Sequence, residues 1–193
     1  LSANSNVNST VLVKEIPDTT SPVIQKVVLD LDTGILSLTF NETIDITPAT
    51  RVQTSSIALV DSETGYDNIL IFLHNAVVSS ALDSVVVNVT LGPFERVAAV
   101  ANSSFLDGTP LKLSANGVVH DIANNFNDNH AYLPITELPD VTPIVTLNAK
   151  VDYNDGMVTL YYSEPIDITP TSLVDLTKLK LVNQTGNADV ALG

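Results

Sequence analysis

Apolar and polar residues alternate over short stretches of this chain. Between positions 34 and 42, Leu36, Leu38 and Phe40 occupy every second position, and mostly polar residues fill the positions between them. Successive side chains of a β-strand point to opposite faces. This period of two therefore predicts a strand with one face in a core and the other toward solvent.

Residues 84–91 show the same alternation and predict a second strand of this kind. Its inner face is expected to carry the apolar residues Val85, Val87, Val89 and Leu91. Shorter patterns bounded by turn residues predict five more strands, at 23–29, 55–60, 68–73, 111–113 and 131–136. Pro134 has no backbone N–H to donate, so the last of these strands is expected at a sheet edge.

One short helix is predicted after Pro93, because proline suits the first position of a helix. The apolar residues that follow it have helical spacing: Phe94, Val97, Ala98 and Val100. About seven short strands in roughly 120 residues are typical of an antiparallel β-sandwich. We therefore expect an all-β protein with one short helix.

The chain also repeats itself at a distance of 122 residues. Residues 34–48 return as residues 156–170, with the same ending Ile-Asp-Ile-Thr-Pro, and Pro17-Asp18 returns as Pro139-Asp140. A repeat of this length predicts tandem domains. The predicted division is the terminal strand of a preceding repeat over 1–16, a complete repeat over 17–138 and the first half of a following repeat over 139–193.

The joins between the predicted repeats contain two prolines within a few residues, at Pro17 and Pro22 and again at Pro139 and Pro143. Proline restricts the backbone to extended conformations, so we expect stiff connectors and a rod of successive modules. The half repeat over 139–193 lacks the strands that would cover its core and is not expected to fold alone. The chain is therefore interpreted as a segment of a longer protein.

Three segments carry a resemblance to a known family: Asp18-x-Thr20-x-Pro22, Gly34-x-Leu36-x-Leu38-x-Phe40-x-Glu42-x-x-Asp45, and Gly117-Val-Val-His-Asp121-Ile-Ala-Asn-Asn125. They resemble bacterial-type Ig-like repeats of large surface proteins such as S-layer proteins and giant adhesins, and similar repeats in giant extracellular proteins of algae. The last segment looks like the Asp-x-x-Gly-Asn corner of that family, with Asn124 in place of glycine, and asparagine tolerates left-handed backbone. The resemblance implies tandem Ig-like antiparallel β-sandwich domains.

Charge and composition narrow the range of partners. The net charge is −14, which disfavours nucleic acid and anionic membranes and favours divalent cations. The three histidines have no metal-ligand spacing, the chain has no cysteine, and no nucleophile or phosphate-loop motif is present. No signal peptide or membrane span is visible either. These features predict a non-enzymatic protein.

Calcium is the one cofactor that the acidic residues suggest. By strand parity Glu42 and Glu164 lie on the inward face, where a carboxylate needs backbone N–H donors or a cation. Asp-x-Asp or Asp-x-Asn turns offer two oxygen ligands on one side of a loop, although acidic residues also suit turns without metal. The candidate calcium ligands at the strand ends, turns and joins are Asp18, Asp30, Asp32, Glu42, Asp140, Asp152, Asn154 and Glu164.

Five sequons match the acceptor pattern for N-glycosylation, at Asn8, Asn41, Asn88, Asn102 and Asn183. Asn41 and Asn88 fall on predicted solvent faces. Together the features predict a structural repeat segment of a large extracellular or cell-surface rod or filament, whose partners are neighbouring repeats and other copies in a fibre or layer. The alternative is an adhesin or carbohydrate-binding module, whose exposed loops would hold either an aromatic or a calcium-linked site.

Overall fold

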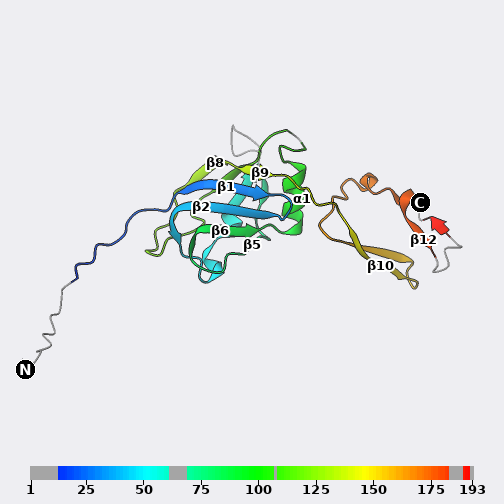
Figure 1. Cartoon of the computed structure of the whole chain (residues 1–193), viewed down its shortest axis with the longest axis horizontal. Helices are drawn as coiled ribbons and strands as arrows, with labels where there is room; N and C mark the ends of the chain where they lie inside the picture. Colours follow the sequence, from blue (N-terminus) through cyan, green and yellow to red (C-terminus); the bar gives the residue numbers. More distant parts are fainter. Residues whose placement is uncertain (1–12, 61–68, 107, 183–188, 192–193) are drawn as a thin grey trace, which may run out of the picture.

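The structure is a computed structural model and describes residues 13–60, 69–106, 108–182 and 189–191. Most of its regular structure is β-strand, as the alternation predicts, and the sheets are largely antiparallel. Figure 1 shows a larger body, which contains the helix and the strands up to residue 138, and a smaller body near the C-terminus. Residues 13–16 of the predicted strand over 1–16 are irregular and exposed, and the rest of that range lies outside the described residues.

The larger body contains a five-stranded sheet with the strand order β5-β6-β2-β1-β9. Its strands are β1 (Ile24–Asp30), β2 (Ile35–Ile44), β5 (Val77–Val78), β6 (Ser84–Thr90) and β9 (Thr136–Leu138). All neighbours in this sheet pair antiparallel except β1 and β9, which are parallel. The last strand of the larger body therefore lies beside its first.

A four-stranded antiparallel sheet with the order β4-β3-β7-β8 forms the second layer. Its strands are β3 (Ile57–Val60), β4 (Ile69–Phe72), β7 (Lys112–Ala115) and β8 (His130–Pro134). Pro134 lies in the edge strand β8, which confirms the predicted edge position. The chain then passes through buried Ile135 into β9 and so changes sheets within one residue.

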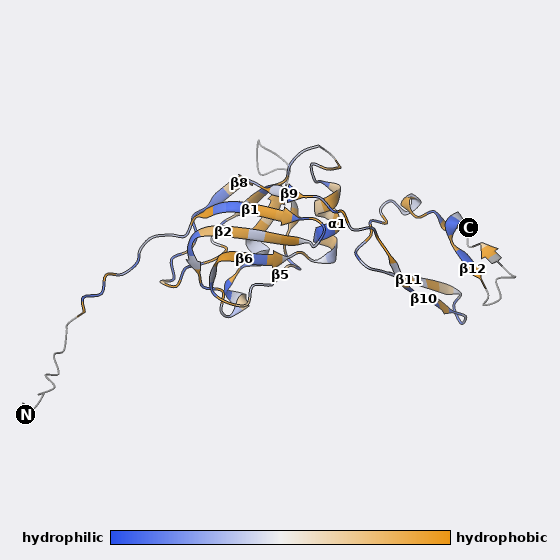
Figure 2. Cartoon of the chain, viewed as in Figure 1, coloured by the Kyte–Doolittle hydropathy of each residue, from blue (hydrophilic) through white to orange (hydrophobic). Residues whose placement is uncertain are grey.

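The core lies between the two sheets and consists of aliphatic side chains from both. Leu36, Leu38 and Phe40 are almost fully buried, as the period of two predicts, and the strands carry most of the apolar colour in Figure 2. Val87 and Val89 are also buried, but the prediction for Val85 is wrong, because its side chain is 43% exposed. Val85 lies near the start of β6, beside the irregular pairing with β2 between Thr39 and Ile44.

The predicted helix is α1 (Pro93–Ala101), which begins at Pro93 as expected. The buried carboxylate of Glu95 accepts hydrogen bonds from the backbone N–H of Gly92 and of Asn75, both at 2.6 Å, and so fixes the start of the helix. Ala99 is buried, whereas Phe94 is exposed despite its place in the apolar spacing.

The smaller body repeats the local structure of the larger one. Its strands are β10 (Thr146–Asp152), β11 (Met157–Tyr162), β12 (Lys180–Val182) and β13 (Asp189–Ala191), which form two antiparallel pairs. β10 begins and ends 122 residues after β1, and the two hairpins share the same register shift near their open ends.

The recurrence continues beyond the hairpin at the same distance. Short 3-10 turns at Ala49–Arg51 and Thr54–Ser56 return at Thr171–Leu173 and Leu176–Lys178. The peptide bond before Pro48 is cis, and so is the one before Pro170. The sequence repeat is thus matched by a repeat of backbone structure over most of residues 18–60 and 140–182.

Burial distinguishes the two copies. Ile46 and Val52 are 1% and 5% exposed in the larger body, whereas their counterparts Ile168 and Val174 are 51% and 40% exposed. The larger body covers these positions with its two full sheets. The described residues after 139 contain no element that corresponds to β6, β7 or α1.

Candidate functional site

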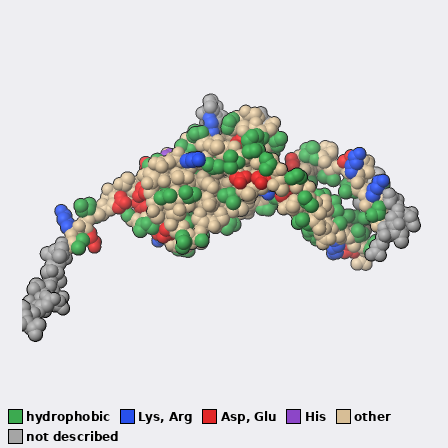
Figure 3. All heavy atoms as spheres, viewed as in Figure 1, with side chains coloured by type: hydrophobic (Ala, Val, Ile, Leu, Met, Phe, Trp, Pro, Cys, Tyr) green, Lys and Arg blue, Asp and Glu red, His purple; other side chains and the backbone are tan. Residues whose placement is uncertain are grey.

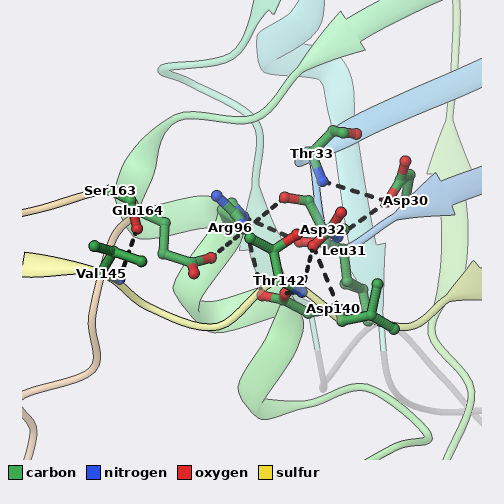
Figure 4. A network of polar contacts seen from close by, with 11 residues as sticks. Asp30, Leu31, Asp32, Thr33, Arg96, Asp140, Thr142, Val145, Ser163 and Glu164 are labelled. Carbon is green, nitrogen blue, oxygen red and sulfur yellow. Dashed lines mark hydrogen bonds and ion pairs between the residues drawn. The ribbon is translucent and has the colours of Figure 1, made fainter.

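The structure distributes the predicted calcium ligands over three places. Asp18 and Glu42 lie at one end of the larger body, whereas Asp152 ends β10 and Asn154 lies in the turn that follows it. Asp32, Asp140 and Glu164 lie where the smaller body meets α1, and Asp30 lies next to them at the end of β1 (Figure 4). Acidic side chains are visible at both ends of the larger body in Figure 3.

The first of these places is a hollow that we call the acidic hollow. Its lining residues are Asp18, Glu42, Thr43, Asp121, Ile122 and Ala123. One carboxylate oxygen from each of Asp18, Glu42 and Asp121 lies within 4.8 Å of the other two. Asp121 was expected to form a structural corner and was not predicted as a ligand, so the structure adds it to the group.

The corner that supplies Asp121 forms as the sequence predicts. Asp121 accepts hydrogen bonds from the backbone N–H of Asn125 and from its Nδ2, both at 2.8 Å. Asn124 adopts a φ of 72°, which confirms its left-handed conformation. The N–H of Asp45 donates to the carbonyl of His120 at 3.0 Å, and this bond holds the corner against the end of β2.

Glu42 is the least satisfied member of the acidic hollow. Its Oε1 is buried and has no hydrogen-bond partner among the described residues. Burial, followed by repulsion from Asp121 and Asp18, raises the pKa of Glu42. A cation bound beside these carboxylates would relieve both costs.

The second place is organised by Arg96 of α1, and we call its contacts the Arg96 junction (Figure 4). Arg96 Nε donates to the carbonyl of Leu31 at 3.0 Å, and Nη2 donates to the carbonyl of Asp32 at 2.6 Å. The same Nη2 lies 2.7 Å from Glu164 Oε2 and 3.3 Å from Asp140 Oδ2. One guanidinium therefore joins the helix, the turn after β1 and the smaller body.

Asp32 supplies a second link across this junction. Its Oδ1 accepts hydrogen bonds from the N–H groups of Thr142 at 2.9 Å and Val141 at 3.3 Å. The bonds from the Thr142 side chain and backbone are the main reason that the pKa of Asp32 is lowered.

Asp30 turns its carboxylate inward within its own turn and accepts from the N–H of Asp32 and Thr33. This places it outside the contacts between the two bodies.

Gly34 makes room for the arginine. Its φ is +70°, and a Cβ at this position would lie 3.0 Å from Arg96 Cδ. Gly156 has a similar φ of +72°, but a Cβ there would have nothing within 4 Å. Among the described residues, the turn at Gly34 is therefore covered by the Arg96 side chain, whereas the equivalent turn at Gly156 has no side chain packed over it.

The two places are related by the repeat. Asp140 and Glu164 follow Asp18 and Glu42 by 122 residues. The connector also has the same local bond in both copies: Thr20 N–H donates to Asp18 Oδ1 at 2.9 Å, and its counterpart Thr142 donates to Asp140 Oδ1 at 3.3 Å. The same acidic pair therefore holds a guanidinium in one copy and faces Asp121 in the other.

The predicted glycosylation sites differ in exposure. Asn41 is exposed, while Asn88 and Asn102 are half-buried. Asn88 accepts a hydrogen bond from Ser37 Oγ at 2.8 Å, on the face of β6 opposite to Val87, as parity predicts. Asn8 and Asn183 lie outside the described residues.

A comparison with protein-family models, curated proteins and solved structures finds no match for the chain. Within the described ranges, no helix has the length and apolar character that are needed to cross a membrane.

Proposed function

We propose that the chain is a non-enzymatic structural segment of a large extracellular or cell-surface rod or filament protein. In this proposal residues 17–138 are one Ig-like sandwich unit, and residues 139–193 begin the next. The observation that carries the proposal is the recurrence of backbone structure at 122 residues, with successive copies in line along the chain.

The Arg96 junction supports a spacing role. The connector between β9 and β10 is limited to residues 139–145 and contains Pro139 and Pro143. Arg96 and Glu164 are largely buried, with side chains 14% and 8% exposed, which makes their ion pair less accessible to screening by salt than a surface pair. Short connectors with fixed polar contacts favour a preferred angle between units.

The predicted partners follow from this architecture: neighbouring repeats of the same protein, and other copies of it in a fibre or layer. N-glycans are proposed as a further feature of the surface, with Asn41 the most accessible of the described acceptor residues. A calcium-dependent adhesin or carbohydrate-binding module is the alternative, and the acidic hollow is the place where the described residues would hold the ion.

The rod proposal is tested by adding copies of residues 17–138 in front of Pro17, in place of residues 1–16. Each addition joins Leu138 of one copy to Pro17 of the next, which reproduces the natural order Leu138-Pro139-Asp140. We expect the maximum dimension from small-angle X-ray scattering to grow by a constant increment with each added copy. A dimension that levels off as copies are added would contradict the proposal, because it would mean that the units fold back on one another.

A further inference from the structure

We propose that Asp18 and Glu42 form the acceptor side of a second junction, which binds an arginine from the helix of a preceding unit. Arg96 of the described helix binds Asp140 and Glu164 in this way. The inference rests on the proposed function, because it requires a unit of the same kind before residue 17. It adds a chemical identity for the partner of the acidic hollow, namely a guanidinium on a neighbouring repeat.

The two acidic pairs correspond in position and in local contacts. Both aspartates lie on the Pro-Asp connector and accept from the N–H of a threonine two residues later. Both glutamates lie near the end of the second strand of a hairpin with the same register shift. Since these positions are equivalent in backbone structure, the contact seen at one of them indicates the kind of contact that the other can accept.

The acidic hollow gathers negative charge that a cationic side chain would neutralise. Asp121 adds a third carboxylate to the pair, and Glu42 Oε1 is buried without a partner among the described residues, as is Oε1 of Glu164, which binds Arg96 through Oε2. Both oxygens of Asp121 already accept from Asn125, which holds this charge in place. An incoming guanidinium would donate to Glu42 and Asp18 and neutralise part of the cluster.

Backbone groups of the connector support the same arrangement. At the Arg96 junction the N–H groups of Val141 and Thr142 donate to Asp32, which belongs to the preceding turn. Their counterparts 122 residues earlier are Thr19 and Thr20, which lie beside Asp18 and are exposed. A preceding unit with an Asp32-type turn would therefore meet the same two donors as well as the same two carboxylates.

The observations favour guanidinium over calcium as the partner. Calcium usually takes six to eight oxygen ligands, whereas the acidic hollow brings together three carboxylates, one of which is already held by Asn125. A guanidinium needs fewer acceptors and matches the contact formed by the equivalent pair. Calcium binding is the competing outcome of the experiment below.

The experiment uses the chain in which one copy of residues 17–138 replaces residues 1–16. The pKa of Glu42 in the original unit is measured by NMR of its labelled side-chain carboxyl, and compared with the value in the 193-residue chain. We expect the pKa of Glu42 to fall when the preceding unit is added. The substitution Arg96→Met in the added copy alone is expected to restore the higher value.

Two controls distinguish a specific contact from a general effect. Arg51→Met in the added copy removes an arginine that contacts Asp45 within its own unit, so it is expected to leave the Glu42 pKa unchanged. Circular dichroism on each variant checks that the added copy folds. An equal Glu42 pKa in the extended chain, its Arg96→Met variant and the 193-residue chain would overturn the inference.

The proposed function fails in a different way. Glu164 reports on the existing junction, and the NMR chemical shift of its side-chain carboxyl is expected to change when Arg96 of the original unit is replaced by methionine. If Glu164 responds and Glu42 does not, the acceptor inference is wrong and the rod proposal stands. If the scattering dimension does not grow with added copies, the rod proposal itself is wrong.

If calcium chloride alone lowers the Glu42 pKa in the 193-residue chain, the acidic hollow is a metal site and the arginine inference is overturned.

Discussion

Glu42 and Glu164 stand at the same place in two copies of one sequence pattern, but they have different partners. Glu164 contacts Arg96 at 2.7 Å, whereas Glu42 faces Asp18 and Asp121. Each retains a buried Oε1 without a hydrogen-bond partner among the described residues. The surroundings of a residue therefore decide whether the same carboxylate favours or opposes folding.

At this scale we predict that Glu42→Gln raises the melting temperature at pH 7. The pKa of Glu42 is higher in the folded chain than in the unfolded chain, so the folded chain holds this proton more tightly. Its contribution to stability is therefore largest below the ordinary glutamate pKa and is lost as pH rises through the raised value. Glutamine avoids this loss.

Thermal unfolding at several pH values measures the effect of Glu42→Gln. The advantage of the variant is expected to shrink toward zero below about pH 4, where glutamate is itself protonated. Glu164→Gln is the matched control and is expected to loosen the Arg96 junction, because it removes the partner of a guanidinium. A variant Glu42→Gln that melts below the parent at pH 7 would show that the Glu42 carboxylate already has a favourable partner.

At the scale of elements, β2 and β11 show how little a strand pattern says about burial. Leu38 in β2 is fully buried, and its counterpart Leu160 in β11 is only half-buried. β2 lies between β1 and β6 and faces a second sheet, whereas β11 has one neighbouring strand. The alternation of apolar and polar residues thus predicts that a strand forms. The neighbouring strands and the facing sheet determine how deeply its apolar side chains are buried.

We therefore predict that Leu38→Ala lowers the free energy of unfolding of the larger body by about 2–5 kcal/mol, the usual range for a buried leucine. Leu160→Ala, the same change at the equivalent position, is expected to leave that free energy nearly unchanged. Urea unfolding followed by circular dichroism measures both. Equal losses for the two variants would mean that the two bodies share one core.

At the scale of the whole molecule, the Arg96 junction sets the relation between the two bodies. Its two links run in opposite directions. The side chain of Arg96 in the larger body donates to the carboxylate of Glu164, whereas the side chain of Asp32 in the larger body accepts from the backbone N–H of Thr142. Asp140 and Thr142 of the connector take part in these links, and the two prolines of the connector restrict its backbone.

Acid is predicted to loosen this junction. Hydrogen bonds from Thr142 lower the pKa of Asp32, so its contact is present above the ordinary aspartate pKa and is lost as pH falls through the lowered value. Distances between spin labels on the two bodies are expected to broaden in that acidic range. Asp32→Asn is expected to give a broader distribution at neutral pH, with less change on acidification. A distribution that stays narrow throughout would exclude Asp32 as a controlling contact.

Much of the fold could be predicted because its signals are local. The alternation at Leu36, Leu38 and Phe40 placed a strand, Pro134 placed an edge, and Asn124 placed a left-handed corner. These features depend on backbone preferences within a few residues. The same patterns failed at Val85, which lies near the start of β6 beside the irregular pairing with β2.

The candidate sites were only partly predictable, because their members come from distant parts of the chain. Asp18 and Glu42 were identified as ligands, but Asp121 reaches them only through the packing of its corner against β2. Arg96 was not identified at all, since nothing near it in the sequence indicates that its side chain crosses Gly34 to reach Glu164. The sequence did offer one signal: Lys and Arg are scarce in this acidic chain, so each of them was a candidate partner for the repeated acidic pair.

The parallel pairing of β9 with β1 has a mechanical consequence. Three residue pairs join these strands, and Leu31 N–H adds a bond to the carbonyl of Leu138 at 3.1 Å. Tension applied through the start of β1 and the end of β9 would pull two parallel neighbours in opposite directions along their own length. All of these bonds would then be strained together instead of opening one after another, and this shear geometry would oppose stretching of the larger body along the chain.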